Sequence, residues 1–284
     1  MTITDTATPA PGASAYQDKL LLGMHVTDLL RSTGTGQVRR GDDGGNAMAI
    51  DSELSTSIDT FRRRLMKVDW SSQSPSRRQI LEVFLVLALE RGINSVSMRM
   101  IAQEIGIKAP SIYSHFPNGR NEILAEASRW HFYKFGTALL TALATCKDAN
   151  QCWTAMVTVH TTRQLTLPES NLWDLLMATD KMVHTLPSEV REEADEMVVL
   201  YENLYRAAAR EMGVSEPDGV VDIVMTLLEG ATRWCDADFS KDVPPELIAR
   251  VDRMTRVILE TARVSTPRKH APKRPRRAPT IPSN

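Results

Sequence analysis

The stretch Ser97–Phe116, SMRMIAQEIGIKAPSIYSHF, decides the fold of this 284-residue chain. It predicts two short helices separated at Gly106, because glycine readily adopts the left-handed conformation that ends a helix. Ser97 is placed to cap the first helix through its hydroxyl. Ile112 and Phe116 lie one turn apart in the second helix, so both are expected to point inward. A helix, a glycine turn and a short second helix describe a helix-turn-helix, whose second helix fits the major groove of DNA.

The second helix of this pair has a polar outer face. Pro110 falls in its first turn, where the missing N–H is harmless. The side chains left to face outward are Ser111, Tyr113, Ser114 and His115.

The composition of the chain argues against several classes of protein. The chain is 42% hydrophobic and 24% charged with a net charge of −1, so any basic footprint for nucleic acid must be local. Three cysteines without paired spacing argue against a disulfide scaffold and fit a reducing cytosol. The spacing of Cys152, His160 and His184 fits no recognised metal site, and no cofactor is indicated. We expect no signal peptide and no membrane span, because no apolar run approaches about 18 residues.

Apolar residues recur at helical spacing along most of the chain, and strand alternation is absent, which predicts an all-α fold. We expect residues 1–74 to form a disordered or weakly helical extension, with the folded core starting near Pro75. Within that extension, a basic helix with apolar positions from Leu54 to Val68 offers either a solvated face or an arm that grips phosphate. The remaining predicted regions are a three-helix DNA-binding domain at 75–120, a helical effector-binding and dimerisation domain at 121–265, and a basic disordered tail at 266–284.

The last two predicted helices carry regular apolar stripes. The stripe in one helix runs from Val220 to Trp234, and that in the other from Leu247 to Ile258, with steps of four and three residues. Such stripes suit helix pairs crossing at about 20°, as in four-helix bundles. Two stripes from each of two chains would make a homodimer, and an intrachain core is the alternative.

The segment from about Arg78 to Leu124 resembles the tetracycline-repressor (TetR) family of transcriptional regulators. The matching text is ALERG at 88–92, SMRMIA at 97–102, IGI at 105–107 and SIYSHF at 111–116. The resemblance implies an all-α regulator, in which an N-terminal helix-turn-helix domain is followed by a variable C-terminal ligand-binding and dimerisation domain. It also implies that effector binding moves the long linker helix, here residues 121–145.

By the family's pattern, Ser97 and Arg99 open the helix that faces the DNA backbone, and Lys108 to Ser111 open the recognition helix. Tyr113 and His115 would hydrogen-bond phosphates, although Tyr113 could instead brace the helix packing. The full predicted DNA-binding set is Ser97, Arg99, Lys108, Ala109, Pro110, Ser111, Tyr113, Ser114, His115 and Arg120.

One position departs from the family's pattern. The family usually carries a lysine three residues after the phenylalanine, where this chain has Gly119, followed by Arg120. This looks like a one-residue insertion in which either the N–H of Gly119 or the side chain of Arg120 meets the phosphate.

A group of aromatic, methionine and histidine side chains on the central helices suits an apolar small-molecule pocket, with plain core packing as the alternative. The predicted ligand-binding residues are Trp130, Trp153, Met156, His160, Trp173 and Met177. The sequence lacks a Gly-x-Ser-x-Gly motif, a P-loop and a dinucleotide fingerprint, so we expect no enzyme and no catalytic residues. The prediction is a cytoplasmic, nucleoid-associated, homodimeric repressor that binds operator DNA under the control of a small molecule. A ligand-independent regulator, or a helical protein-interaction scaffold without DNA binding, is the alternative.

Overall fold

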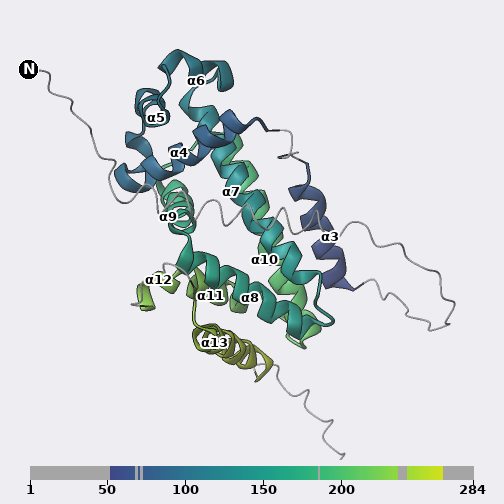
Figure 1. Cartoon of the computed structure of the whole chain (residues 1–284). Coiled ribbons are helices and arrows are strands. Elements are labelled where there is room, and N and C mark those ends of the chain that lie inside the picture. Colours follow the sequence, from purple (N-terminus) through teal and green to yellow (C-terminus); the bar gives the residue numbers. More distant parts are fainter. Residues whose placement is uncertain (1–51, 68–69, 71–72, 185, 236–241, 265–284) are drawn as a thin grey trace, which may run out of the picture. The chain divides into compact units, whose positions relative to one another are not determined.

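The computed structural model describes residues 52–67, 70, 73–184, 186–235 and 242–264. Within these ranges every regular element is a helix, which confirms the predicted all-α class (Figure 1). The expected N-terminal extension up to residue 51 and the expected basic tail from 265 lie outside the described residues.

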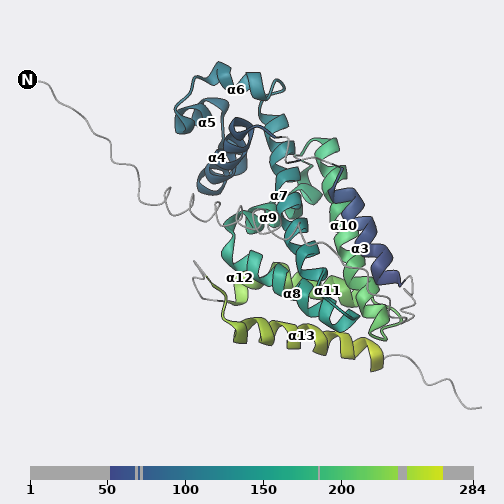
Figure 2. The ribbon, with the colours of Figure 1, turned by 45° about the vertical axis from the view of Figure 1, so that its right-hand side comes forward.

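The first part of the fold is a helix-turn-helix domain. It consists of α4 (Pro75–Arg91), the 3-10 turn η2 (Ile93–Ser95), α5 (Met98–Ile105), α6 (Ala109–His115) and the first turns of α7 (Arg120–Leu143). The three helices α4, α5 and α6 gather at one end of the described chain, and α7 runs from them into the other helices (Figures 1 and 2). Its core is a set of fully buried side chains from all four helices: Ile80, Leu81, Phe84, Ile101, Ile112, Phe116 and Ile123.

The C-terminal helices pack around α8. They are α8 (Ala149–Thr166), α9 (Pro168–Val183), α10 (Ser188–Glu211), α11 (Asp218–Glu229), α12 (Ala231–Trp234) and α13 (Pro245–Val264). Helix α8 contacts α7, α9, α10, α11, α12 and α13, so it is the central element of this part. Its largest buried side chain, Trp153, packs edge-on against Tyr205 of α10, with ring centroids 5.1 Å apart.

Helix α3 (Glu53–Leu65) extends the folded part before Pro75, so the expected start of the core near Pro75 is wrong. Figures 1 and 2 both show α3 beside α10, against which it buries its apolar side. It also approaches α7 closely, because Gly136 leaves the space that Leu65 fills, and a Cβ at Gly136 would stand 2.7 Å from a Leu65 methyl group. The apolar spacing signalled this helix, but spacing alone did not identify what it packs against.

Two arginines on the basic side of α3 form ion pairs with acidic residues. Arg64 donates to Glu196 of α10 over 2.6 Å, and Arg62 pairs with Asp59 over 2.5 Å. Because these arginines already have acidic partners, the geometry favours the solvated-face interpretation over the phosphate-gripping arm.

Candidate functional site

The local geometry of the helix-turn-helix follows the sequence closely. The Ser97 hydroxyl accepts from the Met100 N–H at 3.3 Å and caps α5. Gly106 ends α5 in the left-handed region at φ 80° and ψ 27°, which lets the Ile107 N–H bond the Ala102 carbonyl over 2.9 Å. Pro110 lies in the first turn of α6. The predicted turn chemistry is therefore present at each of these positions.

Most of the predicted DNA-binding side chains lie at the surface of this domain. Ile112 and Phe116 seat α6 in the core with no exposed area, which turns the opposite face of this short helix outward. Ala109, His115 and Arg120 are half-buried. The exposed members of the set are Ser97, Arg99, Lys108, Pro110, Ser111, Tyr113 and Ser114.

The Tyr113 side chain is partly exposed, and its ring packs against Gly119. Its side chain is 49% exposed, and a Cβ placed on Gly119 would lie 3.4 Å from the Tyr113 ring. Gly119 has φ 68°, a conformation that L side chains rarely adopt, so glycine suits this turn. The ring therefore lies against the turn between α6 and α7 while about half of the side chain remains open to a ligand.

The family's phosphate-binding lysine is replaced here by Gly119 and Arg120. The N–H of Gly119 and the side chain of Arg120 both already form hydrogen bonds within the domain. The Gly119 N–H donates to the Phe116 carbonyl over 2.9 Å. The Arg120 guanidinium donates to the Val96 carbonyl at 3.1 Å, to the Ile93 carbonyl, and to Asn94 Oδ1 at 3.4 Å. This geometry gives Arg120 the role of holding the turn that precedes α5.

Arg77 plays a matching part that sequence analysis missed. Its guanidinium carbon lies 4.2 Å from the centroid of the Phe116 ring, and its N–H groups bond the His115 carbonyl and the Gln73 side chain. It thereby fastens the C-terminal end of α6 to α4. A cation three residues into a helix has no distinctive sequence pattern, so only the fold reveals this contact.

Five of the six predicted effector residues belong to one of two apolar clusters, and the sixth, His160, is a buried polar residue. Trp153 and Met156 belong to the core around α8, whereas Trp130, Trp173 and Met177 join the cluster that includes the helix-turn-helix core. The sequence spacing brought all six to the central helices, but the fold does not gather them around one space.

His160 lies in a chain of polar groups within the core. Its Nδ1 is 2.9 Å from the Tyr201 hydroxyl, which in turn is 3.2 Å from the Tyr205 hydroxyl. Burial lowers the pKa of His160 to about 4, so its imidazole is neutral at physiological pH. The same burial raises the pKa of Tyr201 well above its ordinary value.

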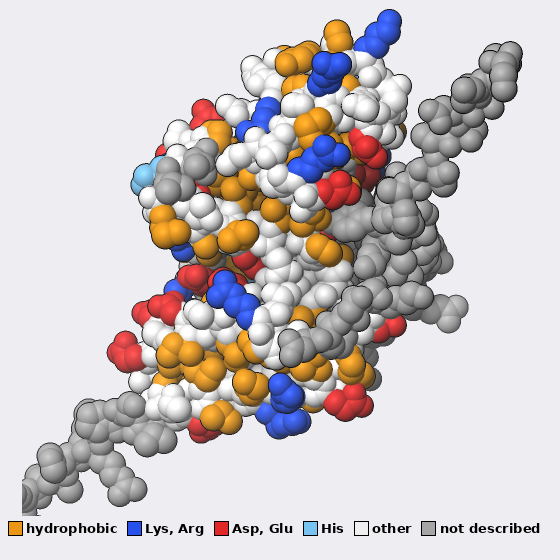
Figure 3. Space-filling model, turned by 90° about the vertical axis from the view of Figure 1, so that its left-hand side faces the viewer, with side chains coloured by type: hydrophobic (Ala, Val, Ile, Leu, Met, Phe, Trp, Pro, Cys, Tyr) orange, Lys and Arg blue, Asp and Glu red, His pale blue; other side chains and the backbone are white. Residues whose placement is uncertain are grey.

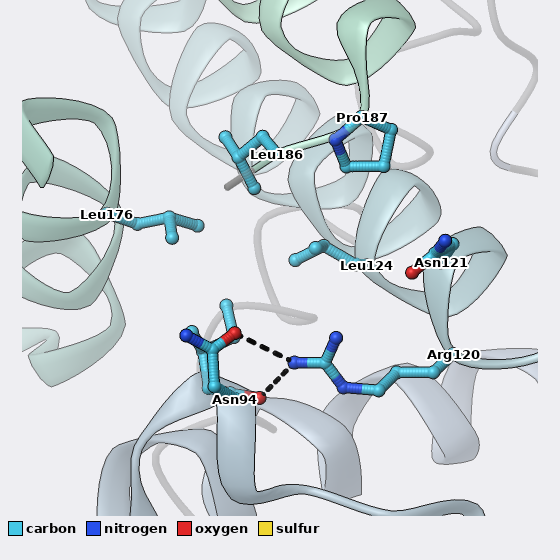
Figure 4. A pocket seen from close by; sticks show the side chains of 8 residues that line it. Asn94, Arg120, Asn121, Leu124, Leu176, Leu186 and Pro187 are labelled. Carbon is cyan, nitrogen blue, oxygen red and sulfur yellow. Dashed lines mark hydrogen bonds between the residues drawn. The ribbon is translucent and has the colours of Figure 1, made fainter. Parts of the chain in front are cut away.

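A cavity of about 290 Å³ opens where the helix-turn-helix domain meets α9 and α10 (Figure 4). The Arg120 guanidinium and Asn94 lie on one side of it, and leucine side chains lie on the other. None of the six predicted effector residues lines this cavity. Its lining is Ile93, Asn94, Arg120, Asn121, Leu124, Leu176, Leu186 and Pro187.

The described ranges contain no cluster of three histidine, cysteine or acidic side chains arranged to hold a metal ion. Among the helices that the structure describes, none has the length and apolar character needed to cross a bilayer.

Comparison with known proteins places the helix-turn-helix in a family. Residues 80–127 match the sequence model of the bacterial regulatory proteins of the tetR family. The resemblance to this family that residues 78–124 predict is thereby confirmed. A comparison with curated proteins found no match.

Solved structures share the fold over most of their length. A bacterial regulatory protein of the tetR family from Rhodococcus RHA1 is 14% identical, and the match covers 67% of this chain and 98% of that one with a TM-score of 0.55. A TetR-family transcriptional regulator from Rhodococcus sp. is 16% identical, with coverages of 67% and 100% and a TM-score of 0.51. A transcriptional regulator from Saccharomonospora viridis, solved in complex with choline, is 23% identical, with coverages of 66% and 97% and a TM-score of 0.52. At these identities the likeness concerns the fold, which is an N-terminal tetR domain followed by a helical C-terminal part.

Proposed function

We propose that this chain is a ligand-controlled transcriptional repressor that binds operator DNA in the cytoplasm through α5 and α6. The observation that carries the proposal is the outward polar face of α6, which the buried Ile112 and Phe116 hold in place. A short helix displayed in this way can enter a major groove, where side chains near its N-terminus meet base edges. Lys108 and Ser111 stand at that end and are exposed.

The remaining exposed residues of the set suit contacts with the DNA backbone. Arg99 offers a cation, and Tyr113 and Ser97 offer hydroxyls, which are the groups that proteins use to hold phosphates. We assign Arg120 to positioning in place of the phosphate contact, since its bonds to Val96, Ile93 and Asn94 orient the turn before α5.

Homodimerisation belongs to the same proposal, through exposed apolar side chains of which only Met254 belongs to the predicted stripes. Val224, Ala231 and Val251 of those stripes are buried within their own subunit, as in the intrachain alternative. The exposed apolar side chains on α11 and α13 are Ile223, Met254 and Val257. Hydrophobic side chains gather over the end of the molecule formed by these helices (Figure 3). An exposed apolar surface of this kind suits a second copy of the chain.

The test is a selection of random duplex DNA by the purified full chain. The proposal predicts enrichment of a sequence with two half-sites about 34–36 Å apart, one helical turn, as a two-fold dimer requires. A matched selection with Tyr113→Ala should enrich the same sequence less efficiently. No enrichment by a folded chain would contradict DNA binding, and enrichment of a single half-site would contradict the dimer.

The control by a small molecule rests on the anatomy of the C-terminal helices. The neighbour from Saccharomonospora viridis was solved with choline, which supports the idea that this fold accommodates small molecules. A ligand that prefers one arrangement of these helices would shift the population of DNA-binding geometries.

A further inference from the structure

The middle of the C-terminal helices holds buried polar atoms that lack hydrogen-bond partners. Among the described residues, nine buried side-chain atoms have no partner, and every one except Arg263 Nε lies on α7, α8 or α9. The residues concerned on these three helices are Trp130, His131, Thr137, Thr161, Arg163, Ser170 and Trp173. Native proteins rarely leave buried donors unpaired, because the lost hydration is not replaced.

These unpartnered atoms call for acceptors. The two indole Nε1 atoms of Trp130 and Trp173 can only donate, and so can the Nε and one terminal nitrogen of Arg163. A molecule that satisfies the unpaired donors of Arg163 and Trp173 must bring several acceptor lone pairs. A carboxylate does so, since its two oxygens accept about four hydrogen bonds and match a guanidinium in a planar, bidentate pair.

Three of these residues, His131 of α7, Arg163 of α8 and Trp173 of α9, lie near one another, whereas the Trp130 ring lies 5.0 Å from that of Trp70. The His131 and Trp173 ring centroids are 5.6 Å apart, and the Arg163 guanidinium carbon lies 5.8 Å from the Phe135 ring centroid. The pKa of His131 is held well below its ordinary value, first by burial and then by the cations Arg163 and Lys134. His131 is therefore neutral and close to both cations.

The charge balance of this place also favours an anion. Lys134 lies 3.5 Å from the Glu169 carboxylate, and Glu169 is the buried acid that faces both Lys134 and Arg163. The other acid near Lys134 is Glu82, whose pKa is raised by burial. Burial lowers the pKa of Arg163 as well, and the attraction of Glu169 opposes that shift.

We propose that α7, α8 and α9 form a site for a small carboxylic acid with an apolar body. Its carboxylate accepts from Arg163 and the indole N–H group of Trp173, and its body packs against the Phe135 and Trp173 rings. The inference rests on the proposed function, for which it names the chemical class of the effector.

The position of Trp173 connects this site to the DNA-binding end. Trp173 and Leu176 of α9 lie in the same apolar cluster as Ile80 and Phe84 of the helix-turn-helix domain. A ligand that draws the Trp173 indole toward its carboxylate moves a side chain shared with that core. Carboxylate binding is therefore expected to change operator affinity.

Two tryptophans provide a test that needs no ligand. Trp173 Nε1 is unpartnered, whereas Trp153 Nε1 donates to Thr255 Oγ1 over 3.0 Å, and both side chains are buried. Substituting phenylalanine for either tryptophan removes one N–H group and the same side-chain volume, so a difference between the two variants reports the hydrogen bond. In thermal unfolding of the full chain, Trp153→Phe is expected to lower Tm by about 2–4 °C more than Trp173→Phe. Equal losses would mean that the Trp173 N–H has a partner, such as a water, and would overturn the proposal.

The ligand arm uses benzoate, hexanoate and decanoate, each against its uncharged amide, with tetramethylammonium as a cationic probe. We expect at least one carboxylate to raise Tm and bind at least about tenfold more tightly than its amide, since a charge-assisted pair is lost in the amide. Arg163→Met should abolish this binding, and Trp173→Phe should weaken it about tenfold. The matched control is Arg253→Met, at an exposed arginine of α13, which should bind as the wild type does.

The possible failures point to different conclusions. Absence of binding by every carboxylate, equal binding of the amides, or preferential binding of tetramethylammonium would each overturn the carboxylate site. Failure of the wild-type chain to bind any selected duplex would instead contradict the proposed function, while carboxylate binding could still be scored from Tm.

Discussion

The helix-turn-helix domain and the centre of the C-terminal helices differ in whether their buried polar side chains have hydrogen-bond partners. In the domain, Arg77 and Arg120 bond backbone carbonyls at the ends of the helices. Between residues 75 and 127, all of which are described, no buried side-chain atom lacks a partner. On α7, α8 and α9, by contrast, Arg163, Trp130 and Trp173 keep buried donors unpaired.

On the proposed function, this difference separates a preorganised DNA-binding surface from a site whose polar groups a small molecule would pair. A surface that reads DNA gains affinity when its backbone is already held in the binding geometry. A site for a small molecule instead keeps polar groups that become satisfied only when the molecule is bound, at some loss of stability in its absence. The predictions below challenge this contrast, from the largest expected effect to the smallest.

The largest effect concerns the response of the buried His160 to acid. The pKa of His160 is lowered to about 4 in the folded chain, so the unfolded chain binds more protons between about pH 6.5 and pH 4. Its contribution to stability is thus complete above pH 6.5 and falls on acidification, by a total on the order of 3 kcal/mol. Asp174 and Glu229 oppose this trend, because burial raises the pKa of Asp174 to about 6 and that of Glu229 to about 7, and acid favours the folded form of each.

Comparing the wild type with His160→Gln cancels the contributions of Asp174 and Glu229. Between pH 7 and pH 4.5, urea unfolding should show that the stability of the wild type falls relative to that of His160→Gln. Parallel pH dependences of the two proteins would contradict a buried neutral imidazole.

The next effect concerns the hydrogen bonds by which Arg120 holds the turn before α5. Arg120→Met removes charge-assisted hydrogen bonds to Val96 and Ile93 and should lower the free energy of unfolding by about 2 kcal/mol. The exposed Arg91, at the end of α4, provides the matched control Arg91→Met, which should change stability little. A stable Arg120→Met protein with lost DNA affinity would show instead that Arg120 serves as a phosphate contact.

A smaller effect concerns the salt dependence of DNA binding. If Arg99 neutralises one phosphate in each subunit, Arg99→Gln should reduce the slope of log affinity against log salt by about 2 for a dimer. Arg253→Gln, on α13, should leave the slope unchanged. Titrations of the selected duplex between about 50 and 200 mM salt measure both slopes. Identical slopes for Arg99→Gln and the wild type would remove Arg99 from the interface.

Much of the fold was predictable because local chemistry determines it. The serine cap at 97, the left-handed Gly106 and the inward-facing Ile112 and Phe116 each act within one or two turns of helix, so their spacing identified the helix-turn-helix. The packing of α3 on α10 joins residues more than 130 positions apart, as in the pair Arg64–Glu196, and no local pattern reports such contacts.

The candidate effector site shows the same limit. Trp173 was predicted as a ligand-binding residue because it is an aromatic side chain on the central helices. Arg163 was missed because a lone arginine on a helix is usually exposed. Only the tertiary structure shows that its guanidinium is buried beside Phe135 and short of acceptors.

The most direct test of the central claim is the affinity of Tyr113→Ala for the selected duplex, measured by fluorescence anisotropy with circular dichroism as a check on folding. Because this side chain is half exposed on the outer face of α6, we expect about a tenfold weaker affinity with unchanged helicity and dimerisation. Tyr113→Phe separates the hydroxyl from the ring. Wild-type affinity in a folded Tyr113→Ala protein would mean that this face of α6 does not lie against the DNA.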